Sequence, residues 1–240
     1  MCLNFEDKYS MSREDSVFWA KRNIVDSIYR EAKLEGVGAT YPDTYQLLQG
    51  RSVAGLDLMD IFVIVDLKNG WKHILSHLDD TPDLDFIKRL HSVIGTKTGI
   101  EWRGNLRDDI VGVGGTDWKP AIPDEKLCRK EIDEILNRDV TPTEKALDLM
   151  LYICRRQMFW DGNKRLAQLV ANHFLIKNGV GTFSVPEHEF GTFLKKLVSY
   201  YETNEPDNLK RWLYDNCIDG TAIPIQDRKK QEKARNNDCR

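Results

Sequence analysis

Apolar residues at helical spacing recur along most of this chain, and glycine or proline stands at the ends of many of these stretches. Between residues 14 and 34, for example, Phe18, Ile24, Ile28 and Leu34 recur near every third or fourth position. This period indicates helices that bury one face. Further helices are expected over about 42–48, 57–78 with Gly70 as a candidate break, 82–94, 124–137, 142–156, 163–178, 187–203 and 206–218. The chain is therefore predicted to be mostly α.

Two segments depart from this helical pattern. Residues 99–123 are rich in glycine and tryptophan, and Val111-Gly112-Val113 before Gly114-Gly115 predicts a hairpin or flap. The tail after residue 220 has almost no apolar residues in QDRKKQEKARNNDCR and is expected to be disordered. The resulting division is an N-terminal helical extension over 1–50, a core domain over 51–220 and a polar tail over 221–240.

Composition excludes several classes of protein. The 240 residues suffice for one sizeable core, and a net charge of -3 gives no bulk attraction to nucleic acid or acidic membrane. No apolar run approaches the roughly 20 residues that span a bilayer, and the polar start is unlike a secretory signal. The five cysteines are scattered without CxxC spacing, which argues against a disulfide framework or a zinc site. We expect a cytoplasmic protein, with Cys154 as a buried helical cysteine.

The segment QMFWDGNKRLAQ, residues 157–168, leads into the helix predicted over 163–178. One face of that helix is apolar and is expected to join the core, with His173 as a satisfied core histidine. That face comprises Leu166, Leu169, Val170, His173 and Phe174. Lys164, Arg165 and Gln168 fall on a different, polar side.

The start of this helix has the properties of an anion-binding turn. Its first free N–H groups lie around Gly162, Asn163 and Lys164, where partial positive charge favours an anion and glycine allows a close approach. Lys164 and Arg165 add two full charges. Asp161 has two open roles, capping the helix or holding Mg²⁺ between phosphate oxygens, and physical reasoning alone favours capping.

The order of residues here resembles the signature of the Fic/Doc (Fido) family, His-x-Phe-x-(Asp/Glu)-(Gly/Ala)-Asn-(Gly/Lys)-Arg. The residues that fit it are Phe159, Asp161, Gly162, Asn163, Lys164 and Arg165, with Lys164 matching the Doc-like branch. Upstream, residues 104–115 resemble the family's flap, which covers the active site and docks a target as an added strand. The resemblance spans roughly residues 35–218. It implies a Fic-fold helical bundle with a small β-hairpin flap and an N-terminal helical extension.

The resemblance also implies a set of site residues. ATP with Mg²⁺ would be the cofactor, and its nucleotide would contact Gly162, Asn163, Lys164, Arg165 and Gln168, with Asp161 holding the metal. A target protein would dock on Val111, Val113, Gly114 and Gly115 and receive AMP or a phosphoryl group on a hydroxyl. Leu34-Glu35-Gly36 followed by Thr40 and Asp43 resembles an inhibitory helix, which gives Glu35 an autoinhibitory role. The Ser/Thr usual four residues before that glutamate is Glu31 here.

Two departures keep the activity open. Gln157 stands at the position of the family's general-base histidine, and an amide has no useful basicity. Gln168 stands where many members carry a final arginine that grips the γ-phosphate. The alternatives are an AMP or phosphoryl transferase, a catalytically inactive antitoxin-like or regulatory module that binds nucleotide or a partner, and a hydrolase of modified targets that uses Glu35. The target, the nucleotide and the oligomeric state, homo-oligomer included, stay open.

Two further residue sets have a structural and a functional interpretation. Trp160 is expected to pack against the flap or core, with base stacking as the alternative. Asp108 and Asp109 are expected to form a solvated turn, because no third ligand is spaced to complete a metal site with them.

Overall fold

The computed structural model describes residues 5–96 and 100–222, and within them it contains nine α-helices. Their bounds are α1 Arg13–Leu34, α2 Tyr41–Leu48, α3 Leu58–Ser76, α4 Leu84–Ile94, α5 Glu125–Asn137, α6 Pro142–Arg156, α7 Asn163–Asn178, α8 Phe190–Thr203 and α9 Asp207–Cys217. Short 3₁₀ turns are η2 Ile100–Trp102 and η3 Glu187–Glu189. The mostly α prediction is confirmed. The tail was predicted to be disordered, and its residues from 223 onwards lie outside the described residues.

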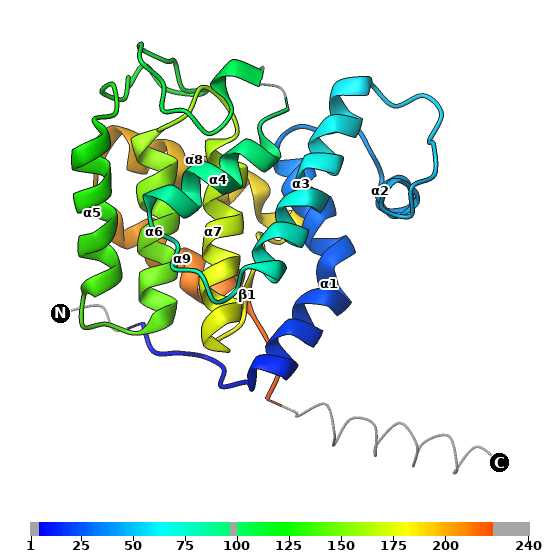
Figure 1. Ribbon diagram of the computed structural model, residues 1–240, viewed down its shortest axis with the longest axis horizontal. Coiled ribbons are helices and arrows are strands. Elements are labelled where there is room, and N and C mark those ends of the chain that lie inside the picture. Colours follow the sequence, from blue (N-terminus) through cyan, green and yellow to red (C-terminus); the bar gives the residue numbers. More distant parts are fainter. Residues whose placement is uncertain (1–4, 97–99, 223–240) are drawn as a thin grey trace.

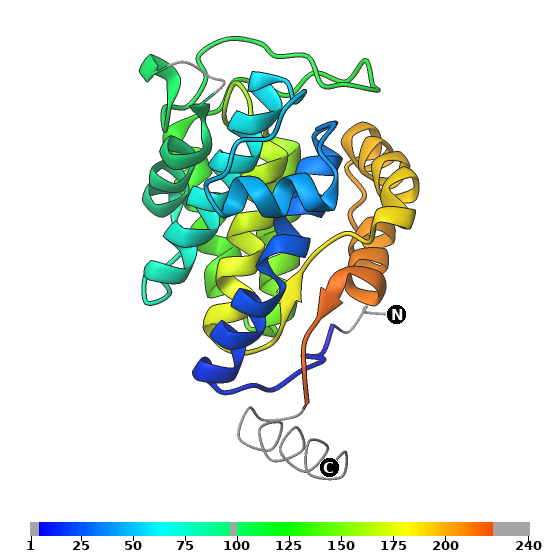
Figure 2. The same ribbon diagram turned by 90° about the vertical axis from the view of Figure 1, so that its right-hand side faces the viewer.

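Helix α7 forms the centre of the bundle (Figure 1). It packs along α6, with α4 and α5 towards one side and α1 and α3 towards the other, and Figure 2 shows α8 and α9 forming a separate flank. Almost all of α7 is buried, including Arg165, Gln168 and Asn172. The side predicted to be polar is therefore covered, because α1 and α3 pack against α7 as well.

Gly70 does not break α3, and the break expected there is wrong. A Cβ at this position would lie 2.6 Å from Leu169 Cδ1 and 2.8 Å from Ile94 Cγ2. The glycine leaves room for the side chains of Leu169 on α7 and Ile94 on α4, which occupy the space that a Cβ would take. Its lower helix propensity is outweighed by that packing.

The end of α1 and the start of α2 place Glu35 over α7. Glu35 is the C-cap of α1, and the following Gly36 adopts φ 81°. Thr40 and Asp43 then form a capping box, in which the Thr40 hydroxyl accepts from the Asp43 amide and the Asp43 carboxylate accepts from the Thr40 amide. These contacts fix the turn that follows Glu35.

The flap segment contains no strand among its described residues, so the hairpin predicted over 99–123 is not formed as a ladder. The reason lies in buried Arg107, whose guanidinium donates to the carbonyls of Asp109 at 2.5 Å, Pro120 at 3.3 Å and Ala121 at 2.5 Å. Carbonyls on both legs therefore bind one cation instead of pairing across the legs. The described sheet is β1 Thr182–Phe183 with β2 Ile218–Asp219, antiparallel.

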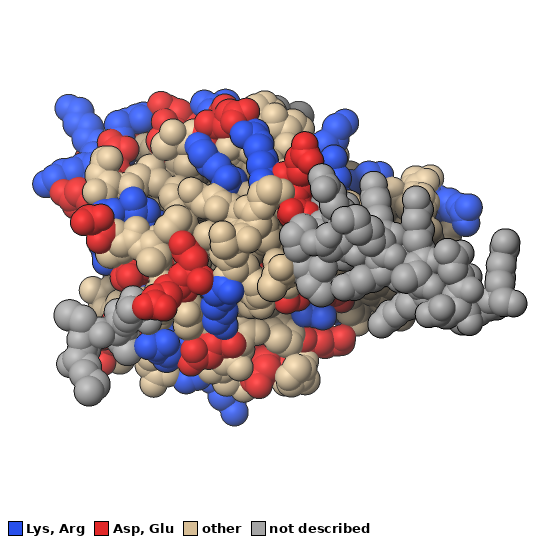
Figure 3. Space-filling view, turned by 90° about the horizontal axis from the view of Figure 1, so that it is seen from below, with Lys and Arg blue, Asp and Glu red and all other residues tan. Residues whose placement is uncertain are grey.

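The surface bears on two exclusions made from the sequence. In the described parts of the chain, every helix is too short or too polar to cross a bilayer. On the face shown in Figure 3, basic and acidic side chains are interspersed rather than gathered by sign. Residues 5–50 do not stand apart from the rest, because α1 contributes Ala20, Ile28 and Ala32 to the same hydrophobic core. The domain division at residue 50 stays a prediction.

Candidate functional site

A cavity of about 290 Å³ lies at the start of α7, and we call it the motif cavity. It is lined by Glu35, Val111, Gly112, Val113, Gly114, Gln157, Trp160, Asp161, Gly162, Asn163, Lys164, Leu194, Leu197, Val198 and Tyr201. The fold thus brings together the end of α1, the flap and the turn that were singled out in the sequence. The contribution of α8 was missed, since its apolar residues at helical spacing carry no signal of which cavity they border.

The N-terminus of α7 faces this cavity without a side-chain cap. Gly162 is the N-cap residue with φ 77°, a conformation that favours glycine, and no side chain bonds to the first amides. The capping role favoured for Asp161 is wrong, because Asp161 stands one residue before the cap. Its carboxylate accepts from Arg165 Nη2 at 3.0 Å instead. The first turn of α7 therefore presents uncapped N–H groups and partial positive charge.

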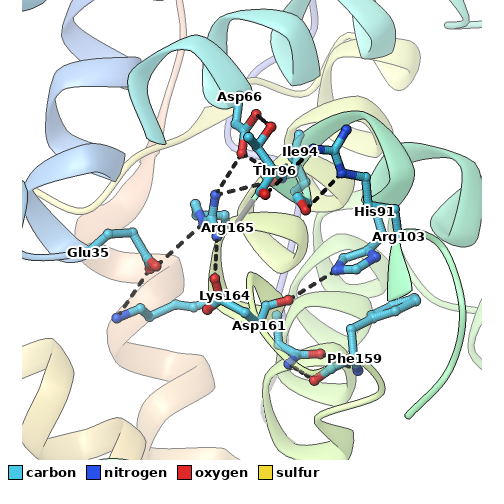
Figure 4. A network of polar contacts seen from close by, with 12 residues as sticks. Glu35, Asp66, His91, Ile94, Thr96, Arg103, Phe159, Asp161, Lys164 and Arg165 are labelled. Carbon is cyan, nitrogen blue, oxygen red and sulfur yellow. Dashed lines mark hydrogen bonds and ion pairs between the residues drawn. The ribbon is translucent and has the colours of Figure 1, made fainter. Parts of the chain in front are cut away.

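Arg165 is turned into the protein interior (Figure 4), with its side chain only 1% exposed. Three carboxylates surround its guanidinium: Asp161 at 3.0 Å, and Glu35 and Asp66 each at 3.5 Å. Nη1 also donates to the Ile94 carbonyl at 3.1 Å. Arg165 does not line the motif cavity, so the structure does not place it as the direct phosphate contact that was predicted.

Gln168 is fully buried and also lies away from the cavity lining. Its Nε2 donates to the Lys164 carbonyl at 3.4 Å within α7. The predicted nucleotide contact at Gln168 has no support in this geometry, because one turn of helix separates the residue from the uncapped amides.

Lys164 is the basic residue of the turn that faces the cavity. Its Nζ donates to the Leu34 carbonyl at 2.9 Å and lies 3.3 Å from Glu35 Oε1. Glu35 contacts Arg165 Nε through its other oxygen, at 3.5 Å. Glu35 thus lies within reach of both Lys164 and Arg165, as the predicted autoinhibitory role requires. One carboxylate occupies the place where an incoming anion would meet Lys164.

Two amide side chains hold the loop before α7. Asn163 Nδ2 donates to the Phe159 carbonyl at 2.6 Å and to Gln157 Oε1 at 3.1 Å, while its Oδ1 accepts from the Phe159 amide at 3.0 Å. Gln157 Nε2 donates to the Cys154 carbonyl at 2.6 Å. The Asn163 side chain thus shapes the loop rather than the cavity surface. Gln157 has a positive φ of 47°, which ends α6 and turns the chain towards α7.

His91 contacts the same loop and helps to hold it, a role that was not predicted from the sequence. Its ring stacks on Phe159 with centroids 3.8 Å apart, and its Nδ1 accepts from the Gly104 amide at 2.9 Å. Nε2 must then carry the proton and donate to the Asp161 carbonyl at 3.0 Å. Burial lowers the pKa of His91 to about 4, so the ring is neutral near pH 7.

The remaining candidates occupy the places expected of structural residues. Cys154 is buried, and burial raises its pKa to about 12. His173 is buried, with Nε2 bonded to the His77 carbonyl at 2.9 Å. Asp108 and Asp109 are exposed, and the described residues contain no cluster of three His, Cys, Asp or Glu side chains suited to a metal ion.

Trp160 both packs and borders the cavity. Its ring meets Trp102 edge-on, with centroids 5.7 Å apart, and the same side chain lines the motif cavity. The expected packing contact is present, and base stacking by the cavity-facing part of the ring stays a prediction.

Comparisons with known proteins bear on the fold of the chain and on the family that its central segment matches. Residues 81–175 match the model of the Fic/DOC family. A fragment of Fic-1 from C. elegans has a similar structure, with a TM-score of 0.70 and 18% identity, covering 85% of this chain and 66% of the fragment. A Fic domain containing signaling protein from Bacteroides thetaiotaomicron gives 0.69 and 20%, covering 86% of this chain and 87% of its own.

A third solved structure, a Fic family protein from Desulfovibrio desulfuricans, gives a TM-score of 0.60 at 15% identity, over 82% of this chain and 59% of the other. No curated protein matches the sequence. At such identities the structural likeness concerns the fold, and the match to the family model adds the sequence of the flap and the turn. Residues 81–175 match the Fic/DOC family model, and the described chain around them has the fold of Fic-domain proteins.

Proposed function

We propose that the motif cavity binds the phosphates of a nucleotide, ATP in the first instance, and that the protein is a nucleotide-dependent transferase acting on a hydroxyl of another protein. The observation that carries this proposal is the uncapped start of α7 beside cavity-facing Lys164. Backbone amides at a helix start combined with a lysine ammonium form a site for phosphate. An apolar wall from α8, with Leu194 and Val198, suits the base of the nucleotide.

Asp161 is the residue that would hold Mg²⁺. Its side chain is 46% exposed at the cavity, and it is also tied to Arg165. Mg²⁺ is commonly held by one or two carboxylates together with phosphate oxygens, so a single carboxylate beside a phosphate site fits the ion. When bound, the ion would neutralise charge on the phosphates. Arg165 acts indirectly in this proposal, by orienting Asp161.

The flap would position the target. Val111, Gly112, Val113 and Gly114 line the cavity without a strand partner among the described residues. A target segment laid along this stretch would gain main-chain hydrogen bonds and bring a hydroxyl to the phosphates. Glu35 would inhibit the reaction, since its carboxylate pairs with Lys164 and repels an incoming phosphate.

The absence of a general base leaves two alternatives to an active transferase. Gln157 offers no proton acceptor, and a missing general base costs roughly 10²–10⁴-fold. Transfer to a target hydroxyl would depend on positioning and charge, which contribute most in phosphoryl transfer. The engagement of both ends of the Gln157 amide within its loop favours the second candidate, an inactive Fic protein that binds nucleotide or a partner as a regulatory module. Hydrolysis of a modified target by water held on Glu35 is a third candidate, favoured by the place of Glu35 on the cavity wall.

A labelled-nucleotide transfer assay separates these candidates. Wild type, Glu35→Gly, Gln157→His and Lys164→Gln are incubated with Mg²⁺ and α- or γ-labelled ATP in a lysate, with Lys126→Gln as a lysine control outside the cavity. Transfer by wild type or Glu35→Gly that is lost in Lys164→Gln supports the transferase, and the label retained identifies AMP or phosphoryl transfer. Transfer only after Gln157→His supports the inactive member. If no variant binds ATP, the proposal fails.

The choice of Lys164 follows from the structure. Asn163→Ala would remove three hydrogen bonds that shape the loop, so its effect on activity would not report on phosphate binding. Loss of label from a premodified target in wild type but not in Glu35→Gly would support the hydrolase instead.

A further inference from the structure

A second cavity, of about 430 Å³, lies at the base of the flap, and we call it the flap-base cavity. The flap contributes residues 118–121, and helices α5, α6 and α8 form the other walls. The side chains that matter here are Lys119, Glu131, Tyr152, Arg155, Arg156 and Tyr200. None of them takes part in the site proposed above.

The charges around the flap-base cavity do not balance. Glu131 is its acidic residue, and it is already occupied by Arg156 Nη2 at 3.4 Å and by the Tyr152 hydroxyl at 2.8 Å. Among the described residues Lys119 and Arg155 have no ion pair. Three cations therefore face one carboxylate, and the surplus charge favours an anion.

The two arginines also have unused hydrogen-bonding capacity. The Nε atoms of Arg155 and Arg156 are buried and have no acceptor among the described residues. A buried N–H without a partner is unfavourable, and a carboxylate is the acceptor that an arginine binds best. These Nε atoms are themselves closed to solvent, so the preference for a carboxylate-bearing ligand rests on the surplus charge of the cavity.

Arg155 is held in place before any ligand arrives. Its guanidinium carbon lies 4.7 Å from the centre of the Trp118 ring, and its Nη2 donates to the Tyr201 carbonyl at 3.3 Å. Trp118 stacks in turn on Tyr201, with centroids 5.5 Å apart, and Tyr201 lines the motif cavity. The two cavities are therefore separated by one stacked pair of rings.

We propose that the flap-base cavity binds an acidic side chain of the protein target and so selects which hydroxyl reaches the motif cavity. This rests on the target docking along the flap under the proposed function. Flap residues 111–114 border the first cavity and 118–121 the second. A target segment that follows the flap would therefore bring a residue near the modified hydroxyl to the flap-base cavity.

The flap-base cavity suits a peptide better than a nucleic acid. Nucleic acids bind to extended basic surfaces that follow a backbone of phosphates, whereas here the cations converge on one cavity that also contains Glu131. A single carboxylate can interact with Lys119 and Arg155 without requiring Glu131 to leave Arg156.

Fluorescent peptides test the proposal on the full chain. Each peptide has a central Thr and a single Glu at a position scanned outwards from it, and a matched set has Gln instead. Anisotropy gives the Kd for wild type, Lys119→Gln, Arg156→Gln and Glu131→Gln. Lys126→Gln removes the same charge from an exposed site outside the cavity.

We expect Glu peptides to bind wild type about two- to fivefold more tightly than Gln peptides at one or two positions, as for a partly exposed ion pair. The preference for Glu over Gln peptides is lost in Lys119→Gln and Arg156→Gln and kept in Lys126→Gln. It is increased in Glu131→Gln, because the new side chain still accepts from Tyr152 but no longer competes as an anion. These opposite signs would not arise from a general loss of folding.

Equal binding of Glu and Gln peptides at every position overturns the proposal, and so does an equal loss in Lys126→Gln, which would indicate bulk charge. ATP binding, measured separately on the same variants, distinguishes the two proposals. A Glu preference without ATP binding refutes the nucleotide site alone, whereas ATP binding without a Glu preference refutes the selection of acidic targets alone.

Discussion

Replacing Glu35 with glutamine should lower stability and raise nucleotide affinity together. The side chain of Glu35 is 15% exposed and faces Lys164, 25% exposed, at 3.3 Å and buried Arg165 at 3.5 Å. Arg165 keeps Asp161 and Asp66 after the change, so no buried charge is left unpaired. The loss therefore lies above the 0.2–1 kcal/mol of an exposed pair and below the 3–5 kcal/mol of a broken buried pair, at about 1–2 kcal/mol.

The same interaction opposes phosphate binding, since Lys164 must leave Glu35 to meet the anion. Removing the carboxylate should tighten ATP binding by about five- to thirtyfold, which is the equivalent of that free energy. Urea denaturation and calorimetric titration measure the two effects. Glu134→Gln, which removes an exposed carboxylate 3.7 Å from Lys130 on α5, is the control and should change neither quantity measurably. An unchanged or weaker ATP affinity in Glu35→Gln would refute the autoinhibitory role.

Four further perturbations test the packing and the buried charges. Gly70→Ala should cost about 1–3 kcal/mol in urea denaturation, because the new Cβ would lie 2.6 Å from Leu169; a cost near zero would show that the helices can separate freely. Arg107→Gln should destabilise by about 3 kcal/mol or more and increase hydrogen exchange in the flap, whereas unchanged exchange would contradict its holding role. Burial depresses the pKa of His91 and His173 to about 4, below the unfolded 6.5, so the unfolded chain takes up protons first and stability falls as pH drops from about 6.5 to 4. Burial raises the pKa of Glu31 to about 8, so the free energy of unfolding also falls as pH rises, by about 1–2 kcal/mol between pH 6.5 and 8. Glu31→Gln should remove this alkaline loss of stability. A loss that persists in the variant would assign the effect to another group.

The sequence predicted the helices well because their periodicity is local. Boundaries set by caps, such as Thr40 before α2, were visible as residue types at the right spacing. Gly70 was misjudged because the sequence does not show that α3 lies against Leu169. The hairpin expected in the flap was misjudged because a buried arginine can take the carbonyls that a hairpin would otherwise pair, and only the tertiary structure shows where Arg107 points.

The site was predicted only in part, because sequence patterns are local and the remaining contacts join distant parts of the chain. Order and spacing brought out Glu35, the flap and the turn, and these do meet at one cavity. Spacing could not show that Arg165 turns inwards to Asp66, because Asp66 lies far away in the sequence and carries no motif. His91 was missed likewise, since a histidine in an amphipathic helix gives no sign that it supports a loop seventy positions later.

The proposed function depends most on phosphate binding by the start of α7 and Lys164. Calorimetric titration of Mg²⁺ with ATP, and of adenosine, into Glu35→Gln and into Glu35→Gln/Lys164→Gln tests this binding directly. Loss of one charge-assisted contact of about 1.5–3 kcal/mol predicts ATP binding about ten- to 150-fold weaker in the double variant, with adenosine binding unchanged. Equal ATP affinity in the two variants, or an equal loss for adenosine, would contradict the claim that Lys164 at the helix start binds the phosphates.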